Sequence, residues 1–365
     1  MRSVLQLRTP EDGSGSPGLN GSHKVRFREP QIEMAHGAGG KATRRLIDGL
    51  FVPLLYGVQG AHAELSDAAH VEIDGTRVAI TTDSFVVRPL RFPGGSIGEL
   101  AVNGTVNDLA VSGATAVALV VSFVLEAGLP SGALESEVRA MASAARAAGV
   151  SIVGGDTKVV EHGKADQMYI ATTGIGRQLT GVALGARLVR PGDRIILSGP
   201  IGDHGITILL ARGELDLEAG LQSDTRSVLP LVEALVAAAA PGLRWMRDPT
   251  RGGVATALNE LALDCGLGIH LTESRIPIRD EVRGACELLG LDPLHIANEG
   301  QFLAVVAPEY ADAALAALHA TAGGEAAAVI GDVREEPAAA VLVTTGYGGS
   351  RIVDMLVGDP LPRIC

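Results

Sequence analysis

The chain has 365 residues, the length of about two domains at roughly 150 residues each. Hydrophobic residues make up 47% of it and charged residues 20%, the proportions of a folded protein with a sizeable core. The net charge of −12 argues against a nucleic-acid partner, and no apolar run reaches the roughly 18 residues of a membrane span.

The first segment, residues 1–31, is rich in glycine, serine, proline and charge, and we expect a disordered N-terminal extension. It lacks the continuous apolar stretch of a secretory signal. The chain has three cysteines, an odd number without the spacing of a disulfide framework. A reducing cytoplasm is therefore the expected location.

Residues 32–185 are predicted to form the first domain, because helices and strands alternate along them. A glycine-rich loop at 36–41 precedes a helix expected over 42–56. Two further helices, expected over 98–112 and 134–148, have apolar residues at helical spacing. The strands, rich in β-branched and apolar residues, are expected over 78–82, 117–125, 151–153 and 168–174. The short strand at 151–153 is expected to end at Gly154-Gly155-Asp156-Thr157.

Residues 186–345 repeat the alternation of helices and strands and are predicted to form the second domain. A turn at 190–193 opens it, and a glycine-rich loop at 199–205 precedes a helix. Strands are expected over 194–198, 302–306 and 340–344, with helices over 227–240 and from Val254 onward. The remaining residues, 346–365, contain two prolines and show no periodicity. They are predicted to be a flexible, extended and poorly packed tail that ends in Cys365.

Four acidic residues follow or lie beside strand ends and glycine-rich turns: Asp83, Asp108, Asp156 and Asp248. The ends of strands line the crevice where ligands bind in α/β sheets. Carboxylates gathered there suit Mg²⁺, which takes a few carboxylates together with phosphate oxygens. Any one of these residues could instead cap a helix or stabilise a turn. Taken together, the four favour a metal-assisted phosphate site.

Other residues could contact phosphate. The glycine-rich loop ends in Lys41 before a helix, where backbone N–H groups and a cation can meet an anion. It is not a Walker A loop, because Ala42 follows the lysine. A flexible turn explains this loop equally well. Asp156-Thr157-Lys158 and Thr250-Arg251 are either phosphate contacts or surface charge, and Glu299 is either a site carboxylate or a solvated loop residue.

The terminal Cys365 belongs to none of the helices or strands predicted from the sequence. Prenylation needs a cysteine four residues from the end, and no metal-ligand partners lie near it in the sequence. A thiol on an extended tail can reach a distant site, since ten extended residues span up to roughly 35 Å. A covalent carrier role is therefore open, beside the alternative of an unexplained exposed thiol.

The motifs together resemble the HypE family of hydrogenase maturation proteins, which are carbamoyl dehydratases. The wider superfamily also includes aminoimidazole ribonucleotide synthetases and selenophosphate synthetases. The matching stretches, which extend from about Met34 to the C-terminus, are HGAGGKATRRLIDGLF, TTDSFVVRPLRFPGGSIGELAVNGTVNDLAVSGA, IVGGDTKVV, GDHG, RDPTRGGVATALNELA, VRGACELLGLDPLHIANEG and the terminal PRIC. The N-terminal extension is the one departure from the family pattern.

The resemblance implies a two-domain α/β (α+β) synthetase-like fold that uses ATP and Mg²⁺. It implies an N-terminal ATP-binding and dimerisation domain whose sheet pairs with its copy across a homodimer, and a C-terminal α/β sandwich domain. It also implies a reaction. The carbamoyltransferase HypF loads a carbamoyl group onto Cys365, ATP phosphorylates its oxygen, and loss of phosphate leaves a thiocyanate. The cyano group then passes to iron on a HypC–HypD complex, as a ligand for a nickel–iron hydrogenase.

The resemblance also assigns roles to individual residues. The metal and the triphosphate would be organised by Asp83, Asp108, Asp156 and Asp248. The nucleotide would be bound by Gly39, Gly40, Lys41, Asn107, Thr157, Arg251 and Asn259. Catalysis would involve Cys365 as the carrier, with Lys158 near the carbamoyl group and Glu299 as the general base that removes a nitrogen proton.

Two other functions remain open at this point. A small-molecule phosphotransferase resembling selenophosphate synthetase would share the ATP site but would have no use for a terminal thiol. A non-catalytic, ATP-responsive scaffold for metallocentre assembly would bind nucleotide without hydrolysing it. The density of acidic and glycine motifs favours an enzyme over a scaffold.

Overall fold

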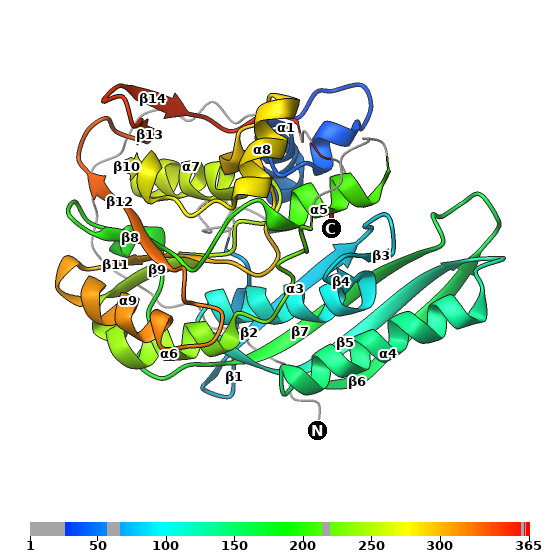
Figure 1. Ribbon diagram of the computed structural model, residues 1–365. Coiled ribbons are helices and arrows are strands. Elements are labelled where there is room, and N and C mark those ends of the chain that lie inside the picture. The colour runs from blue at the N-terminus through cyan, green and yellow to red at the C-terminus, as the bar shows by residue number, and fades with distance from the viewer. Residues whose placement is uncertain (1–25, 57–65, 214–219, 359–360, 362) are drawn as a thin grey trace.

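The computed structural model describes residues 26–56, 66–213, 220–358, 361 and 363–365. Most of the predicted N-terminal extension therefore lies outside the described residues. The rest forms two α/β domains, each built on its own mixed sheet (Figure 1). Among the described residues no helix is both long and apolar enough to cross a membrane.

The N-terminal domain is a five-stranded sheet with helices on one face. Its strands are β1 (Ala69–Ile73), β2 (Thr76–Phe85), β5 (Ala114–Glu126), β6 (Ser151–Val160) and β7 (Met168–Gln178). The strand order is β1-β2-β7-β5-β6, and every neighbouring pair is antiparallel except β5 and β6. The helix α4 (Ser131–Ala147) connects this parallel pair, as parallel strands require.

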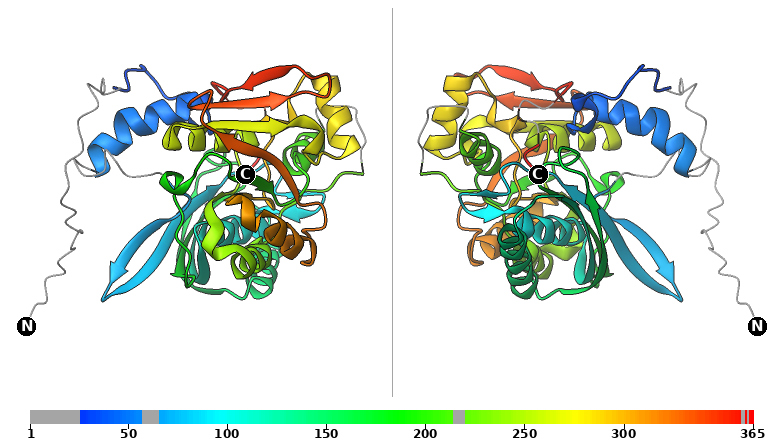
Figure 2. Two further views of the ribbon diagram at one scale, coloured as in Figure 1. Left: turned by 90° about the vertical axis from the view of Figure 1, so that its left-hand side faces the viewer. Right: turned by 90° about the vertical axis from the view of Figure 1, so that its right-hand side faces the viewer.

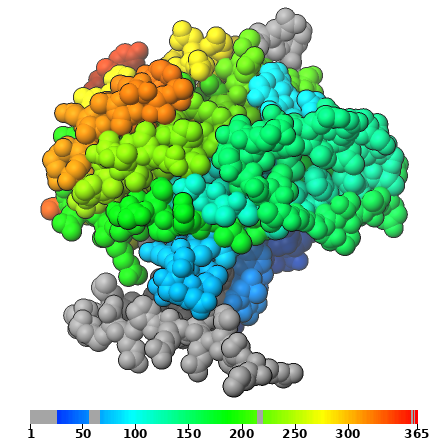
Figure 3. Space-filling model, turned by 90° about the horizontal axis from the view of Figure 1, so that it is seen from below, coloured from blue at the N-terminus to red at the C-terminus, as the bar shows by residue number. Residues whose placement is uncertain are grey.

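The second helix of this domain, α3 (Ile97–Val111), lies beside α4 over the same sheet face (Figure 1). Almost all of α3 is buried, because it packs on the sheet on one side and on the C-terminal domain on the other. Two short strands, β3 (Arg91–Phe92) and β4 (Gly95–Ser96), form the hairpin that precedes it. In the view from below, the β1–β2 hairpin (light blue) stands out from the rest of this domain (Figure 3).

The C-terminal domain is a seven-stranded sheet with the order β14-β13-β10-β12-β8-β11-β9. Its strands are β8 (Arg194–Leu197), β9 (Leu243–Arg247), β10 (Gly268–Thr272), β11 (Leu303–Val306), β12 (Ala328–Arg334), β13 (Ala340–Thr344) and β14 (Ser350–Val353). Its helices are α5 (Asp203–Ala211), α6 (Leu229–Ala239), α7 (Gly253–Cys265), α8 (Asp280–Leu289) and α9 (Ala311–His319).

Both faces of this sheet are covered, which explains the continuous apolar runs of its central strands. On β8, Ile195 and Leu197 belong to the core cluster that contains α7, whereas Ile196 belongs to the cluster that contains α6 and α9. The second cluster continues into the N-terminal domain through the apolar residues of α3. The two domains therefore share one packed interface.

The glycine-rich loop leads into a helix, as predicted. The helix α1 (Lys41–Leu46) continues as the π-helical segment η2 (Ile47–Tyr56), and the two stand out from the body of the molecule (Figure 2). The helix start is attached to the C-terminal segment, because Lys41 N–H donates to Leu356 O at 2.8 Å and Ala42 N–H donates to Val357 O at 3.3 Å.

Two expectations about chain segments are wrong. The strand expected over 151–153 continues to Val160, so Asp156 and Thr157 lie within an edge strand and not in a turn after it. The tail expected to be poorly packed contributes β14 to the sheet, and its last residues are buried, with Ile364 1% and Cys365 9% exposed. Apolar contacts with both domains hold the end of the tail in place.

Candidate functional site

Three aspartates from both domains converge at the domain interface. Asp67 lies just before β1, Asp108 lies on α3, and Asp248 follows β9. Each offers a carboxylate oxygen, and these three oxygens lie within 4.8 Å of one another. Two of the three were predicted from the sequence. Asp67 was missed, although its position directly before a strand is a signal comparable to that of Asp248 directly after one.

Burial and mutual repulsion make this cluster electrostatically unfavourable when it is fully ionised. Burial, then Asp248, Asp67 and Asp83, raise the pKa of Asp108 well above its ordinary value. Burial, then Asp67, raise the pKa of Asp248 in the same way, with Arg247 opposing. Burial raises the pKa of Asp67 to about 6. A divalent cation among these oxygens would relieve the repulsion, and oxygen-only ligands of this kind suit Mg²⁺.

Neighbouring side chains hold the cluster in place. Arg247 Nε lies 2.9 Å from Asp67 Oδ1, and its Nη2 lies 3.1 Å from Glu260 Oε2. The Thr81 hydroxyl donates to Asp108 Oδ2 at 2.8 Å. Asp83 lies on β2, and its charge raises the pKa of both Asp108 and Asp248. It is therefore electrostatically part of the same site.

Glu299 is buried beside the cluster. Its Oε1 atom has no hydrogen-bond partner among the described residues. Burial raises the pKa of Glu299 well above its ordinary value, followed by the charges of Asp248 and Asp83, whereas Arg251 lowers it. Its backbone N–H donates to Asp224 Oδ1 at 3.0 Å, which fixes the turn. A carboxyl group with a raised pKa is a stronger base than an ordinary carboxylate once it is ionised, so Glu299 is suited to exchange a proton with a bound substrate.

The two predicted asparagines join elements of the fold. The Asn107 amide nitrogen donates to Arg226 O at 2.9 Å and Glu299 O at 3.1 Å, and Asn107 Oδ1 accepts from Val228 N–H at 2.8 Å. Asn107 thus attaches α3 to the loop that carries Glu299. The Asn259 amide nitrogen donates to Ala255 O at 2.8 Å and to Val353 O at 3.0 Å, which attaches α7 to β14.

The glycine-rich loop is placed against Arg251. Arg251 Nη1 donates to Gly37 O at 2.8 Å. Gly39 has φ +76°, and a Cβ there would lie 2.7 Å from Arg251 O, so only glycine fits. A Cβ on Gly40 would clash with the Leu356 carbonyl. Lys41 extends elsewhere, because its Nζ pairs with Asp354 Oδ2 at 2.5 Å.

A further group of predicted residues is not brought to the cluster within one chain. Asp156, Thr157 and Lys158 lie exposed on β6, the edge strand of the N-terminal sheet. Lys158 Nζ pairs with Asp156 Oδ2 at 2.7 Å. Hydrogen bonding to Lys158, and then to the Thr157 backbone, lowers the pKa of Asp156.

The C-terminal residue lies at the end of the strand that carries Asp83. Val86, which follows β2 directly, donates its N–H to Cys365 O at 3.0 Å. Cys365 is buried, and the residue before it, Ile364, is bound through its carbonyl by His204 at 2.6 Å. The terminal residue is thus part of the domain interface and is hydrogen-bonded to the end of the carboxylate-bearing strand.

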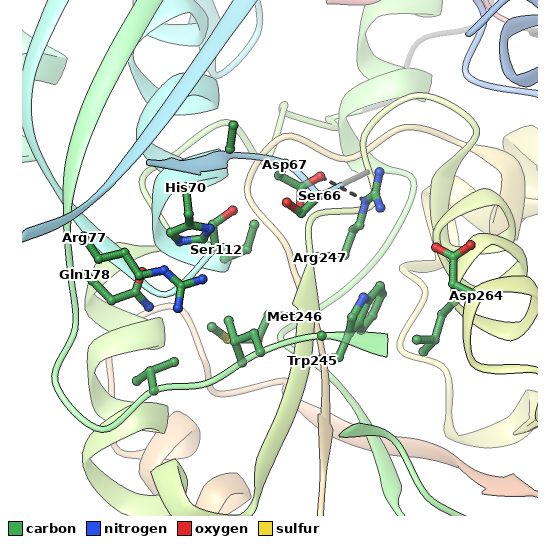
Figure 4. Close-up of a pocket in the computed structure, with 16 residues that line it drawn as sticks. Ser66, Asp67, His70, Arg77, Ser112, Gln178, Trp245, Met246, Arg247 and Asp264 are labelled. Atoms are coloured by element: carbon green, nitrogen blue, oxygen red, sulfur yellow. Dashed lines mark ion pairs between the residues drawn. The ribbon is translucent and has the colours of Figure 1, made fainter. Parts of the chain in front are cut away.

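A pocket of about 400 Å³ adjoins the cluster at the seam between the domains (Figure 4). Asp67 belongs to both the cluster and the pocket wall. His70, Arg77 and Gln178 lie together at one side of the pocket, and Trp245 lies across from them (Figure 4). This is the only tryptophan of the chain.

Both domains of the chain match known protein families. Residues 65–178 match the N-terminal domain of AIR synthase related proteins, and residues 190–344 match their C-terminal domain. The chain is 48% identical over 342 residues to "Carbamoyl dehydratase HypE" of Azotobacter vinelandii, covering 94% of this chain and 99% of the relative. It also resembles two solved structures. One is the crystal structure of a HypE–HypF complex, with a TM-score of 0.80, 41% identity, and coverage of 85% of this chain and 99% of that one. The other is hydrogenase maturation protein HypE in complex with ATP, with a TM-score of 0.76, 44% identity, and coverage of 92% and 100%.

Proposed function

The chain belongs to the HypE carbamoyl dehydratase family of hydrogenase maturation, and we propose that it dehydrates a carbamoyl group carried on its own Cys365. The observation that carries this proposal is the docked tail. The terminal residue is buried at the domain interface, and its carbonyl oxygen accepts from Val86 N–H just past the end of β2, the strand that bears Asp83. A small-molecule phosphotransferase would have no use for that arrangement.

The proposed reaction starts from a thiocarbamate, in which the sulfur of Cys365 is bonded to C(=O)NH₂. Transfer of the γ-phosphoryl group of ATP to the carbonyl oxygen makes that oxygen a good leaving group. The C–O bond then breaks as the C≡N bond forms, and the nitrogen loses two protons, one to Glu299 and one to the departing phosphate. The products are the thiocyanate, ADP and phosphate. Glu299 is the proposed proton acceptor, because its buried carboxyl has an unpartnered oxygen and a raised pKa.

The metal site is proposed at Asp67, Asp108 and Asp248, with Asp83 beside them. The residues fit a divalent cation, because three carboxylate oxygens converge within 4.8 Å and the charge of Asp67 raises the pKa of both Asp108 and Asp248. Mg²⁺ bound there would neutralise charge on the phosphates of ATP. The carboxylates position the phosphates, and Arg251, whose charge lowers the pKa of both Asp83 and Glu299, supplies a cationic side chain.

The pocket at the domain seam is proposed to hold the nucleoside end of ATP. Its volume suits a small ligand, and it shares Asp67 with the cluster, so one nucleotide could extend from the cluster into the pocket. Trp245 lines this pocket and is the only tryptophan of the chain, so the tryptophan fluorescence of the protein reports on the pocket. This fluorescence should change on addition of ATP and should not change on addition of inorganic triphosphate. An equal response to both would contradict this placement.

The second half of the site is proposed to come from a partner subunit. The edge strand β6 exposes apolar side chains, with Val153 65% and Val159 67% exposed, together with its backbone edge. Exposed apolar edge strands of this length are normally paired or covered. A homodimer that covers β6 would carry Lys158, Asp156 and Thr157 toward the site of the other subunit. Lys158 would then act beside the carbamoyl group in trans.

Mixing of two inactive variants tests this dimer. Lys158→Ala and Cys365→Ser should each be inactive alone. After subunit exchange, half of the dimers are mixed, and each mixed dimer contains one complete site, so about a quarter of wild-type activity should return. A mixture of Glu299→Gln with Lys158→Ala is the matched control, because Cys365 is intact in both chains. Its mixed dimers also contain one complete site each, so the same quarter of wild-type activity should return. Failure of the first mixture to recover, with mixed dimers confirmed by mass, would contradict action in trans.

A carrier thiol needs one partner that loads the carbamoyl group and another that accepts the cyano group. We propose that HypF loads the carbamoyl group and that a HypC–HypD complex accepts the cyano group. The tail must leave its buried position to meet either one. The cytoplasmic location stays a prediction from the cysteine pattern.

A further inference from the structure

The last residues of the tail are held by side chains of the C-terminal domain. His204 Nε2 lies 2.6 Å from Ile364 O, and Arg212 Nη2 donates to Arg363 O at 2.8 Å. His204 lies in the first turn of α5, and Arg212 directly follows its last residue. The His204 ring also packs edge-on against Phe92, with ring centroids 5.6 Å apart.

The N-terminal domain holds the same residues from the other side. Arg363 Nη1 lies 3.0 Å from Asp166 Oδ2, and its Nε and Nη2 donate to Val86 O at 3.3 and 3.2 Å. The Val86 N–H in turn donates to Cys365 O. Three consecutive tail residues are thus bound by both domains at once.

We propose that His204 and Asp166 are positioning residues that latch the tail into the site while dehydration takes place and release it for exchange with the partners. This inference rests on the proposed carrier role of Cys365. Neither residue touches the reacting group. Each acts through the tail backbone or through Arg363, by keeping the last residues of the chain in one position.

The latch is suited to repeated opening, because each residue keeps a second partner when the tail leaves. His204 Nδ1 lies 2.8 Å from Ser223 Oγ, and Asp166 Oδ2 lies 3.5 Å from Arg88 Nη1. A buried polar group that loses its only partner carries a large desolvation penalty. Here that penalty is reduced on both sides, so the tail can dock and undock without trapping the protein in one state.

The state of His204 agrees with this role. Burial lowers the pKa of His204 to about 4, so the ring is neutral at pH 7. A neutral ring that accepts from the Ser223 hydroxyl at Nδ1 carries its proton on Nε2, where it can donate to Ile364 O. The docked tail therefore requires one tautomer of His204, because the Ile364 carbonyl can only accept a hydrogen bond.

Alkylation of Cys365 tests the latch without any catalysis. The full-length protein is treated with iodoacetamide, and the modified C-terminal peptide is followed by mass spectrometry, which separates Cys365 from the other two cysteines. His204→Phe keeps the ring packing but removes the hydrogen bond, and Asp166→Asn removes the ion pair. Loss of one such interaction should speed alkylation of Cys365 about 5- to 10-fold. His204→Gln, which restores a donor, should recover most of the protection.

The control removes an equivalent bond elsewhere. His319 Nε2 lies 2.8 Å from the backbone oxygen of Ala327, far from the tail in the fold, so His319→Phe should leave Cys365 alkylation unchanged. On protein that already carries the carbamoyl group, His204→Phe and Asp166→Asn should slow dehydration, whereas loading by HypF should be unchanged or faster. Wild-type alkylation rates in both folded variants would overturn the latch. Absence of thiocyanate in the wild-type protein would overturn the proposed function instead, and would leave the alkylation result intact.

Discussion

Replacement of Asp67 by asparagine should make the metal-free protein more stable, although it removes an ion pair. Burial raises the pKa of this carboxyl from 3.8 to about 6, even with Arg247 opposing the shift. A shift of roughly two pH units at about 1.36 kcal/mol each amounts to about 3 kcal/mol against the ionised form. An asparagine side chain is uncharged at every pH, so Asp67→Asn removes this penalty.

The pH dependence has a definite sign. A carboxyl whose pKa is raised by folding stabilises the protein fully below its unfolded-state value and loses that stabilisation as the pH rises through the folded-state value. The wild-type protein should therefore lose stability relative to Asp67→Asn between about pH 4 and pH 7. The difference should approach its maximum of about 3 kcal/mol at pH 8 and disappear below about pH 4.

Ligand should reverse the order of stability. A cation and nucleotide that bind the native cluster at 1,000 times their Kd add about 4.1 kcal/mol to the wild-type protein, which exceeds the penalty of about 3 kcal/mol. Asp67→Asn lacks one of three converging carboxylates and should gain much less. The assay is urea unfolding in EDTA and in MgATP at pH 5 and pH 8. Asp332→Asn, whose partner Arg334 lies two residues further along β12, is the control and should respond to ligand like the wild type. The reasoning is refuted if Asp67→Asn is less stable than wild type in EDTA at pH 8, or if MgATP stabilises both equally.

Three further changes follow from the same site. Cys365→Ser should keep the melting temperature and ATP binding of the wild type but form no thiocyanate; product from this variant would exclude the carrier role. Glu299→Gln should slow single-turnover dehydration by roughly 10²- to 10⁴-fold with loading by HypF unchanged, because the amide cannot accept a proton; a near wild-type rate would assign the base elsewhere. Val153→Lys on the open edge of β6 should lower the mass measured by light scattering from dimer to monomer and abolish activity; an unchanged dimer mass would move the interface away from β6.

Most helices and strands could be predicted from the sequence, because the spacing of their apolar side chains indicates which face of each element is buried. The helices α3 and α4 and the strands β5 and β8 lie within a few residues of their predicted bounds. The edge strand β6 was predicted too short. Its glycine pair is typical of a turn, and only pairing with β5 shows that the strand continues through it.

The carboxylate site was predicted in part and for a partly wrong reason. We expected the residues to meet at strand ends and glycine-rich turns, whereas Asp83 lies within β2 and Asp108 lies within the helix α3. The convergence of Asp108 and Asp248 arises from the packing of α3 against the C-terminal domain, which local sequence does not report. The burial of the tail was likewise beyond local prediction, because His204 and Arg212, which bind it, lie more than 150 residues away along the chain.

Oxygen-isotope tracing tests the central claim most directly. HypF and a carbamoyl donor labelled with ¹⁸O in the carbonyl group would load Cys365, and excess donor would be removed before MgATP is added. We expect the C-terminal peptide to lose the elements of one labelled water and the released phosphate to carry one ¹⁸O atom, because the carbamoyl oxygen leaves bonded to phosphorus. Unlabelled phosphate, or a C-terminal peptide that keeps its carbamoyl group while ATP is consumed, would contradict dehydration on Cys365.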